Sequence, residues 1–419
     1  MANLLDELYL IIDGDGHVVE VNETYDTIDP RYRERRPIYT QASEGNIVRL
    51  IDGKVWGPNA EGGFVAVNAN GIAPLGKGFH YRRMGTYNAW ARLPDMDEDK
   101  IDVAVIYPTD ELPLSITPDA GFATARAKAY NDWLHSYCSV LPERLKGIGV
   151  VAMQDTEMAV HEMNRAVTEL GMVGIQIGCT VREDTLLSDV RLEPFWTEAE
   201  RLNIPIAIHG PALPSFFRSY YDVNRPDHML EASQMAHTFA QMLACSNIIT
   251  GGVLERHPKL KIAFLEAGAG WVPYWMDRLD EYNEVARTRW AQMSARPSEY
   301  IKGGNVFFSC EPGDAFIPLF LEHIGEDAML FASDYLHFDA LFVGEVGHDG
   351  IPYPGTVGTL LQREDVPDSA KRKMLLDNSL KFYDFKPADL GRIGDAVARQ
   401  ESQKARDAVL AGTVSYRSN

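Results

Sequence analysis

Short apolar runs alternate along the chain with longer segments that have the periodicity of amphipathic helices. Apolar runs of strand length, bounded by glycine or polar residues, are typical of strands that helices cover on both faces of a parallel sheet. Eight such runs lie at residues 9–12, 102–107, 146–151, 173–178, 204–209, 260–266, 305–310 and 329–333. Eight strands alternating with helices predict a (β/α)8 TIM barrel, an α/β fold. The alternation alone also permits a doubly wound open sheet.

A long polar stretch at residues 18–92 interrupts this alternation. Within it, apolar runs at 47–51 and 54–56 flank Asp52-Gly53, which predicts a hairpin with a two-residue turn. Stretches of this length with little regular structure are usually functional, so we interpret residues 18–92 as an insertion or lid over one end of the barrel. A decorative or disordered excursion is the alternative.

The pattern predicts one barrel domain over residues 1–385, which includes the insertion. A charged tail with helical stretches follows over residues 386–419. This tail is a candidate arm in a homo-oligomer, which is the assembly that we expect.

The composition argues against several classes of partner. Among the 419 residues, 60 are acidic and 40 are basic, and the formal net charge of −20 argues against nonspecific binding to nucleic acid or an anionic membrane. The four cysteines are far apart and lack CxxC spacing, which fits a reducing compartment. Acidic residues near the N-terminus stand where a signal peptide would be basic, and no apolar stretch is long enough to span a bilayer. We expect a soluble, cytoplasmic protein.

Side chains that can bind metal stand where four of the predicted strands end. Asp15 and His17 follow the first strand, and because they are two residues apart on an extended chain their side chains project to the same side. His209, Glu266 and Asp334 end the fifth, sixth and eighth strands. In a barrel the carboxyl ends of all strands open on one face. The sequence therefore predicts a divalent metal site on that face.

Each of these signals has a structural explanation when it is taken alone. The run Asp13-Gly14-Asp15-Gly16 is ordinary turn chemistry, a strand that ends in histidine often carries a structural histidine, and Ser333-Asp334 can cap a helix. Capping does not explain four strand ends with ligand-type residues on one rim, so the convergence favours the metal site. His237 lies inside a helical run, and we interpret it as a core or helix-face residue.

Four motifs resemble those of the metal-dependent amidohydrolase superfamily. They are Asp15-Gly16-His17, Ile208-His209-Gly210, Phe264-Leu265-Glu266-Ala267-Gly268 and Ala332-Ser333-Asp334-Tyr335. The set is most similar to the amidohydrolase-related branch that contains aminocarboxymuconate-semialdehyde decarboxylase. The resemblance extends from the first strand to about Tyr383 and is more specific than any single motif.

The resemblance implies roles for individual residues. Asp15 and His17 fall on the first-strand pair of metal ligands, which is usually His-x-His, while His209 and Asp334 match the fifth-strand and eighth-strand ligands. Glu266 falls where many members have a histidine that activates water or contacts substrate. A carboxylate there can act as a general base or as a fifth metal ligand, but it cannot donate a proton as an imidazolium does. The candidate catalytic residues are then Glu266, Asp334 and His337.

The implied cofactor is a divalent ion, with zinc, iron and manganese as candidates because the ligand set is rich in carboxylates, and a two-metal site is conceivable. From the metal-activated water of the superfamily we expect a hydrolase that cleaves an amide, ester, lactone or thioester of a carboxylated small molecule. One alternative is non-oxidative decarboxylation of an aromatic or unsaturated carboxylic acid. A second alternative is a binding barrel without catalysis. His337 is a candidate substrate contact, and a loop hydrogen bond is the competing interpretation.

Overall fold

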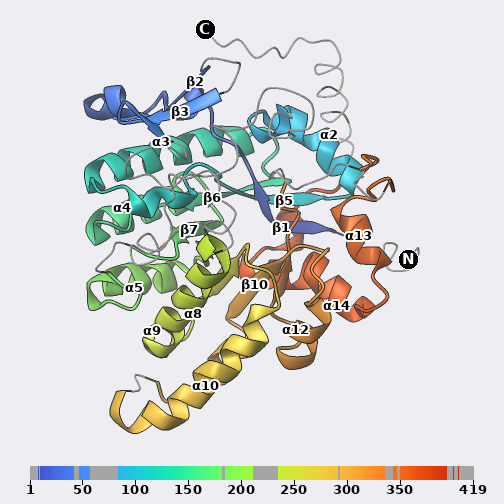
Figure 1. Cartoon of the computed structure of the whole chain (residues 1–419). Coiled ribbons are helices and arrows are strands. Elements are labelled where there is room, and N and C mark those ends of the chain that lie inside the picture. The colour runs from blue at the N-terminus through green and yellow to red at the C-terminus, as the bar shows by residue number, and fades with distance from the viewer. Residues whose placement is uncertain are drawn as a thin grey trace.

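The computed structural model describes residues 8, 10–41, 47–56, 84–181, 185–210, 235–290, 293–335, 343–346, 350–393, 400 and 404. Its core is an eight-stranded sheet in which neighbouring strands are parallel. The order of the strands in the sheet is their order along the chain. The strands are β1 (Ile12–His17), β5 (Val103–Tyr107), β6 (Leu145–Val150), β7 (Gly174–Gly178), β8 (Ile206–His209), β9 (Ile262–Leu265), β10 (Val306–Cys310) and β11 (Met329–Phe331). Figure 1 shows helices around this sheet, and the predicted (β/α)8 TIM barrel is confirmed.

The α-helices lie between the strands and follow the last one. They are α2 (Ala89–Asp99), α3 (Ala120–Cys138), α4 (Thr156–Thr168), α5 (Glu193–Leu202), α8 (Ala240–Thr250), α9 (Val253–Arg256), α10 (Trp271–Trp290), α11 (Pro297–Ile301), α12 (Ile317–His323), α13 (Thr356–Gln362), α14 (Asp368–Arg372) and α15 (Asn378–Phe382). Aspartates fix several starts, because Asp119 and Asp155 accept hydrogen bonds from backbone N–H groups in the first turns of α3 and α4. Over the described residues, no helix is both long and apolar enough to cross a membrane.

The barrel core is built from strand residues that are buried on both faces. Every residue of β5, β8, β9, β10 and β11 is buried, which explains why these strands read as continuous apolar runs rather than as alternating ones. Aromatic rings fill the space between β9, β10 and α10, where Phe264 stacks on Phe308 and Trp271 meets both rings edge-on. The core thus accounts for the sequence pattern directly.

The first strand continues through the polar run that follows its apolar start. The pairing of β1 with β5 shifts register between Asp13 and Gly16, which marks an irregularity at this point of the strand. A Cβ atom at Gly16 would lie 2.4 Å from Asp13 Oδ2, so no larger residue fits there without movement of that carboxylate. The Asp-Gly-Asp-Gly run is therefore strand and not a turn.

Asp13 joins the first strand to the last. Its Oδ1 accepts the backbone N–H of Ser333 at 2.9 Å, and its Oδ2 accepts the Ser333 hydroxyl at 2.6 Å. Beyond this contact, the N–H of Asp334 donates to the carbonyl of Asp15 at 3.0 Å, and the N–H of His17 donates to the carbonyl of Tyr335 at 2.6 Å. These bonds place β11 beside β1 and close the barrel where the predicted ligands lie.

A second, three-stranded sheet lies in the segment that interrupts the barrel pattern. Its strands β2 (Ile38–Gln41), β3 (Ile47–Ile51) and β4 (Lys54–Trp56) are antiparallel. Asp52 and Gly53 have φ values of 56° and 70°, which confirms the predicted two-residue turn. Figure 1 shows β2 and β3 beside α3, and a small cluster of Tyr25, Ile28, Ile51, Phe122, Ala125 and Ala129 packs between this segment and α3.

The described part of the segment attaches to the carboxyl-end face of the barrel. Arg49 of β3 binds Asp110, which lies in the loop after β5, with 2.6 Å between Nη1 and Oδ1. That the whole insertion acts as a lid stays a prediction, because residues 57–83 lie outside the described residues. The predicted tail over 386–419 also falls mostly outside them.

The closure of the barrel predicts a stability change that depends on pH. Burial raises the pKa of Asp13 to about 6 from 3.8, against the effects of the Ser333 hydrogen bonds and the Arg92 charge. Because the native pKa lies above the unfolded one, this group's contribution to stability is complete below 3.8 and is lost as pH rises through 6. Asp13→Asn mimics the protonated group at every pH. The free energy of unfolding of this variant, relative to that of wild type, should therefore increase as the pH rises from 3.8 to about 6.

Asp13→Ala should instead lower the free energy of unfolding by about 2–4 kcal/mol, because two buried donors of Ser333 lose their acceptors. Chemical denaturation of both chelator-treated variants at several pH values measures these effects. An Asn variant whose stability relative to wild type is the same at every pH would contradict this account of the closure.

Candidate metal centre

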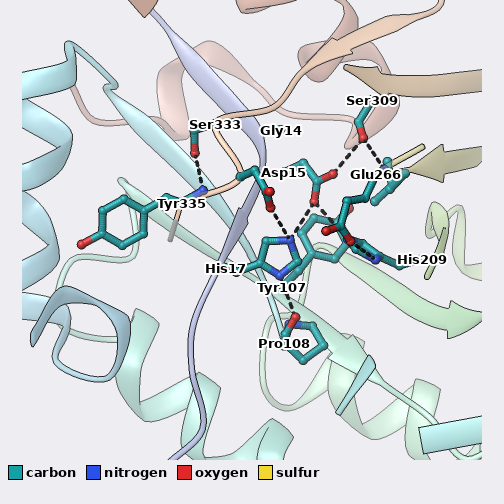
Figure 2. Close-up of polar contacts among 12 residues, drawn as sticks. Gly14, Asp15, His17, Tyr107, Pro108, His209, Glu266, Ser309, Ser333 and Tyr335 are labelled. Atoms are coloured by element: carbon teal, nitrogen blue, oxygen red, sulfur yellow. Dashed lines mark hydrogen bonds and ion pairs between the residues drawn. The ribbon is translucent and has the colours of Figure 1, made fainter. Parts of the chain in front are cut away.

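Three of the predicted ligands converge at the carboxyl-end face of the barrel. Asp15 Oδ1 lies 3.6 Å from His17 Nε2 and 3.6 Å from His209 Nε2, and the dashed lines in Figure 2 join Asp15 to both rings. Asp334 is the fourth, with its Oδ1 3.5 Å from His17 Nε2. All four residues are buried. Side chains from β1, from the end of β8 and from the residue positions after β11 thus meet at one point, as the sequence predicts.

The spacing of these atoms fits a shared cation. Distances of 3.5–3.6 Å are too long for hydrogen bonds. Two ligands that each lie about 2.1 Å from one ion are separated by about 3–3.5 Å. Asp15 Oδ1 and His209 Nε2 have no hydrogen-bond partner within the described part of the chain, although both are buried. Two imidazoles and two carboxylates that face a common point form a donor set suited to a divalent metal ion.

Backbone carbonyls hold both imidazoles in the orientation that such a site needs. His17 Nδ1 lies 2.7 Å from the carbonyl of Pro108, and His209 Nδ1 lies 2.7 Å from the carbonyl of Gly210. A carbonyl can only accept, so each Nδ1 carries the proton and each Nε2 presents a lone pair to the centre. Asp15 is fixed as well, because its Oδ2 accepts the Ser309 hydroxyl at 2.8 Å.

The electrostatic environment at the centre favours positive charge. Burial lowers the pKa of His209, but the negative charges of Asp15 and Glu266 beside the ring outweigh burial and raise the pKa. The carboxylates therefore attract a proton onto the ring. A metal ion at this position would satisfy the same negative charges.

Glu266 reaches the site from the outer side of a ligand ring. Its Oε2 lies 3.4 Å from His209 Nδ1, which is the edge of the imidazole that faces away from Asp15. Its backbone N–H donates to Ser309 Oγ at 3.0 Å, and Figure 2 shows it beside Ser309 and His209. Glu266 is therefore brought to the site, but metal ligation by Glu266 stays a prediction.

His237 lies next to Glu266, which the sequence did not indicate. Its Nδ1 is 3.5 Å from Glu266 Oε2 and 3.2 Å from the Glu266 carbonyl. It belongs to a π-helical turn, η9 (Met235–Phe239), and such turns are frequent at functional sites. His237 is partly exposed, so its interpretation as a core or plain helix-face residue misses this contact. The predicted substrate contact His337 lies outside the described residues.

The backbone is strained where two of the carboxylates emerge. Glu266 and Asp334 have φ values of 55° and 50°, a left-handed conformation that costs a residue other than glycine about 1–2 kcal/mol. Glu266 follows β9 directly and Asp334 lies three residues beyond the end of β11, where the chain leaves the rim of the barrel. Strain of this kind is typical of functional sites, and here it sets the direction of both carboxylates.

Tyr107 forms an aromatic wall beside the two histidines. Its ring centroid lies 6.1 Å from that of His17 and 5.7 Å from that of His209. Its hydroxyl lies 2.8 Å from the Tyr383 hydroxyl, which donates to the carbonyl of Gly14 at 2.7 Å, so Tyr107 donates in turn. Burial raises the pKa of Tyr107 well above 10.0, and the phenol remains neutral. No sequence signal indicates this contact, which joins residues 276 positions apart.

Comparison with known proteins shows which proteins this chain resembles. Residues 12–385 match the family model described as amidohydrolase. The chain is 27% identical over 315 residues to 2-amino-3-carboxymuconate-6-semialdehyde decarboxylase from Dictyostelium discoideum, covering 72% of this chain and 78% of that one. It is 27% identical over 261 residues to gamma-resorcylate decarboxylase from Rhodococcus jostii (strain RHA1), covering 58% and 76%. The fold is similar to that of dihydroxybenzoic acid decarboxylase from Polaromonas sp. JS666, which was solved with manganese and the inhibitor 2-nitroresorcinol (TM-score 0.60, 20% identity, coverage 91% and 99%).

These relatives correct the reaction that we expected from the sequence. Both curated relatives are named as decarboxylases, which contradicts the expected cleavage of an amide, ester, lactone or thioester by a hydrolase. The physical reason is that a cation held by imidazoles and carboxylates can either activate water or bind a substrate oxygen. The rim residues from which hydrolysis was inferred are therefore compatible with both reactions.

The geometry predicts that His209 is required for metal binding. His209→Ala removes one donor and leaves a cavity beside Asp15, so the purified variant should contain little metal, whereas wild type should contain about one divalent ion per chain. His161→Ala, on the exposed face of α4, is the matched control and should keep the wild-type content. Elemental analysis of both variants measures this, and full occupancy in His209→Ala would contradict the assignment.

Proposed function

The chain belongs to the amidohydrolase family, and on that premise we propose that it is a metal-dependent, non-oxidative decarboxylase of an aromatic or unsaturated carboxylic acid. The observation that carries the proposal is the buried convergence of Asp15, His17, His209 and Asp334 in a chain whose curated relatives are decarboxylases. The substrate class follows from those relatives, which are named for an unsaturated and an aromatic carboxylic acid.

The proposed cofactor is one divalent metal ion, with manganese as the first candidate. Asp15 and Asp334 supply oxygen donors and His17 and His209 supply nitrogen donors, a mixed set that suits manganese, iron or zinc. Manganese is preferred because it is bound in the Polaromonas enzyme with a similar fold. When bound, the ion would hold and polarise a substrate oxygen near the carboxylate that leaves.

The reaction requires one proton and no oxidant. The bond between the substrate carbon and its carboxylate breaks, carbon dioxide leaves, and the electron pair remains on that carbon until a proton joins it. We assign this proton to the pair of Glu266 and His237, whose side chains lie 3.5 Å apart beside the ligand His209. A carboxylate next to an imidazole can take up, hold and pass one proton. By the resemblance described above, Glu266 stands where many members of the superfamily have a histidine at the end of the sixth barrel strand. In this arrangement His237 supplies an imidazole next to that position.

The surroundings of the site suit the loss of a carboxylate. Asp15, His17 and His209 are each at most 2% exposed, and the neutral ring of Tyr107 lies beside them. In such a water-poor site, a substrate carboxylate loses part of its hydration and the uncharged product carbon dioxide is favoured. The chain thus positions the substrate next to fixed charges while it excludes bulk water.

The proposed reaction makes a direct prediction about products. The manganese-loaded protein should release carbon dioxide from at least one member of a panel of dihydroxybenzoates, carboxyvanillates and unsaturated dicarboxylic acids. In D2O, the product should carry one deuterium on the carbon that lost the carboxylate, because the proton comes from exchangeable groups. The His209→Ala variant is the control for metal dependence. Cleavage of amide, ester or lactone substrates without any decarboxylation would refute the proposal.

The role of the proton-delivering pair can be tested with three variants. Glu266→Gln and His237→Gln should each lower turnover by about 10²–10⁴-fold, the usual scale for a positioned proton donor. Both should keep their metal, because the proposal places neither residue among the four donors. If the two residues act as one unit, the double variant should be little worse than either single variant. Metal content, turnover and melting temperature are measured side by side. Unchanged turnover in Glu266→Gln would remove the pair from the mechanism, and metal loss would make Glu266 a ligand instead.

A further inference from the structure

A buried carboxylate three residues after His17 holds the loop that follows β5. Glu20 is 1% exposed, and its side chain accepts hydrogen bonds from three consecutive backbone N–H groups. The donors are Thr109 at 3.4 Å, Asp110 at 2.8 Å and Glu111 at 3.1 Å. Both carboxylate oxygens take part, with Oε2 facing the first two donors and Oε1 the third. One side chain therefore binds three successive backbone amides of residues 109–111, and Arg49 Nη2 adds a hydrogen bond to the Asp110 carbonyl at 2.8 Å.

The same loop carries the carbonyl that orients a proposed metal ligand. Pro108 immediately precedes the three amide groups, and its carbonyl accepts the Nδ1 proton of His17 at 2.7 Å, as Figure 2 shows. One residue after His17, the N–H of Val18 donates to the carbonyl of Tyr107 at 3.0 Å. Residues 17–20 and 107–111 are thus joined at successive points, and the last of these is Glu20.

The far side of the loop is attached to other parts of the chain. Asp110 pairs with Arg49 of β3 and accepts the hydroxyl proton of Tyr39. Glu111 pairs with Arg126 of α3 and accepts the hydroxyl proton of Tyr25. These bonds use the side chains of Asp110 and Glu111, whereas Glu20 binds their backbone. Removal of a Tyr contact therefore perturbs the same buried cluster without releasing the loop backbone.

We propose that Glu20 is a positioning residue for His17, which holds the Pro108 carbonyl where it keeps the His17 proton on Nδ1 and the Nε2 lone pair toward the metal centre. This inference rests on the metal-binding part of the proposed function. Without the three amide bonds, the loop could shift, and the carbonyl would no longer select one tautomer of the ring. Groups that orient a ligating histidine in this way typically change metal affinity by about 10–100-fold when they are removed.

The burial of Glu20 supports this assignment. Burial, and the charges of Asp110 and Glu111 next, raise the pKa of Glu20 to about 8, so an ionised carboxylate at this position costs stability. Its three amide bonds offset part of that cost. An apolar residue would avoid the cost of a buried acid, but it would leave the three amide donors of residues 109–111 without their acceptor. The buried acid is therefore matched to the loop that carries the Pro108 carbonyl.

The test compares Glu20→Gln with the matched control Tyr25→Phe. Glutamine places an N–H donor against a backbone N–H donor, so it breaks at least one of the hydrogen bonds that hold the loop backbone. Tyr25→Phe removes one side-chain hydrogen bond of the same cluster and leaves the three bonds to the loop backbone in place. Titration calorimetry with Mn²⁺ should give an affinity about 10–100-fold weaker for Glu20→Gln and nearly unchanged for Tyr25→Phe. Nitrogen-15 NMR of the chelator-treated proteins should show His17 protonated on Nδ1 in wild type and in Tyr25→Phe, and a mixture of tautomers in Glu20→Gln.

The outcomes separate this inference from the proposed function. Wild-type Mn²⁺ affinity and tautomer in Glu20→Gln would overturn the role of Glu20 and leave the metal centre intact. Wild-type protein that binds no Mn²⁺ would overturn the metal centre itself. If both variants lose Mn²⁺ affinity in proportion to the decrease in their melting temperatures, Glu20 is only structural. If Glu20→Gln does not fold, Glu20→Asp keeps the carboxyl group but is too short to reach all three amides, and the same measurements decide.

Discussion

The contact between the first and last barrel strands is the constraint on which the site depends. Asp13 binds both the backbone and the hydroxyl of Ser333, and these bonds set Asp334 next to Asp15 and His17. Three of the four proposed ligands therefore come from the two strands that this contact joins. A shift of one residue between these strands would turn their side chains to the other face of the sheet and separate the donors. The closure of the barrel and the convergence of these three proposed ligands thus depend on the same contacts.

Around this contact, buried charge is arranged so that each group has a specific partner. Carbonyls hold the rings of His17 and His209, the Ser309 hydroxyl holds Asp15, and strained backbone directs Glu266 and Asp334. Farther out, Arg49 and Arg126 balance Asp110 and Glu111. Burying so many ionised groups does not favour stability by itself, because desolvation offsets most of the attraction. What the arrangement provides is fixed geometry at the rim, which a metal site and a proton-delivering pair both require.

The sequence predicts the parts of this arrangement that follow from local rules. Eight apolar runs correspond to the eight strands of the barrel, and the rule that strand ends share one face is enough to predict that Asp15, His17, His209 and Asp334 converge. The roles of Tyr107 and His237 could not be predicted, because they depend on how distant elements pack and nothing in their own neighbourhoods marks them. Asp13 was missed for another reason. In the sequence its Asp-Gly-Asp-Gly run reads as a turn, and only the partner Ser333, 320 positions away, shows that it belongs to a strand.

The choice between hydrolysis and decarboxylation cannot be derived from the metal ligands, because both reactions place the same kind of cation on the same rim. They differ in what the protein must do with a proton. Hydrolysis needs a base that removes one from water, whereas decarboxylation needs an acid that gives one to carbon. A glutamate alone at the end of β9 fits the first requirement better. With His237 placed 3.5 Å from it by a neighbouring helical turn, the pair can meet the second, since the imidazole can hold the proton that the carboxylate passes on. A glutamate at this strand end is therefore compatible with the proposed reaction, because His237 brings an imidazole next to it from a different element.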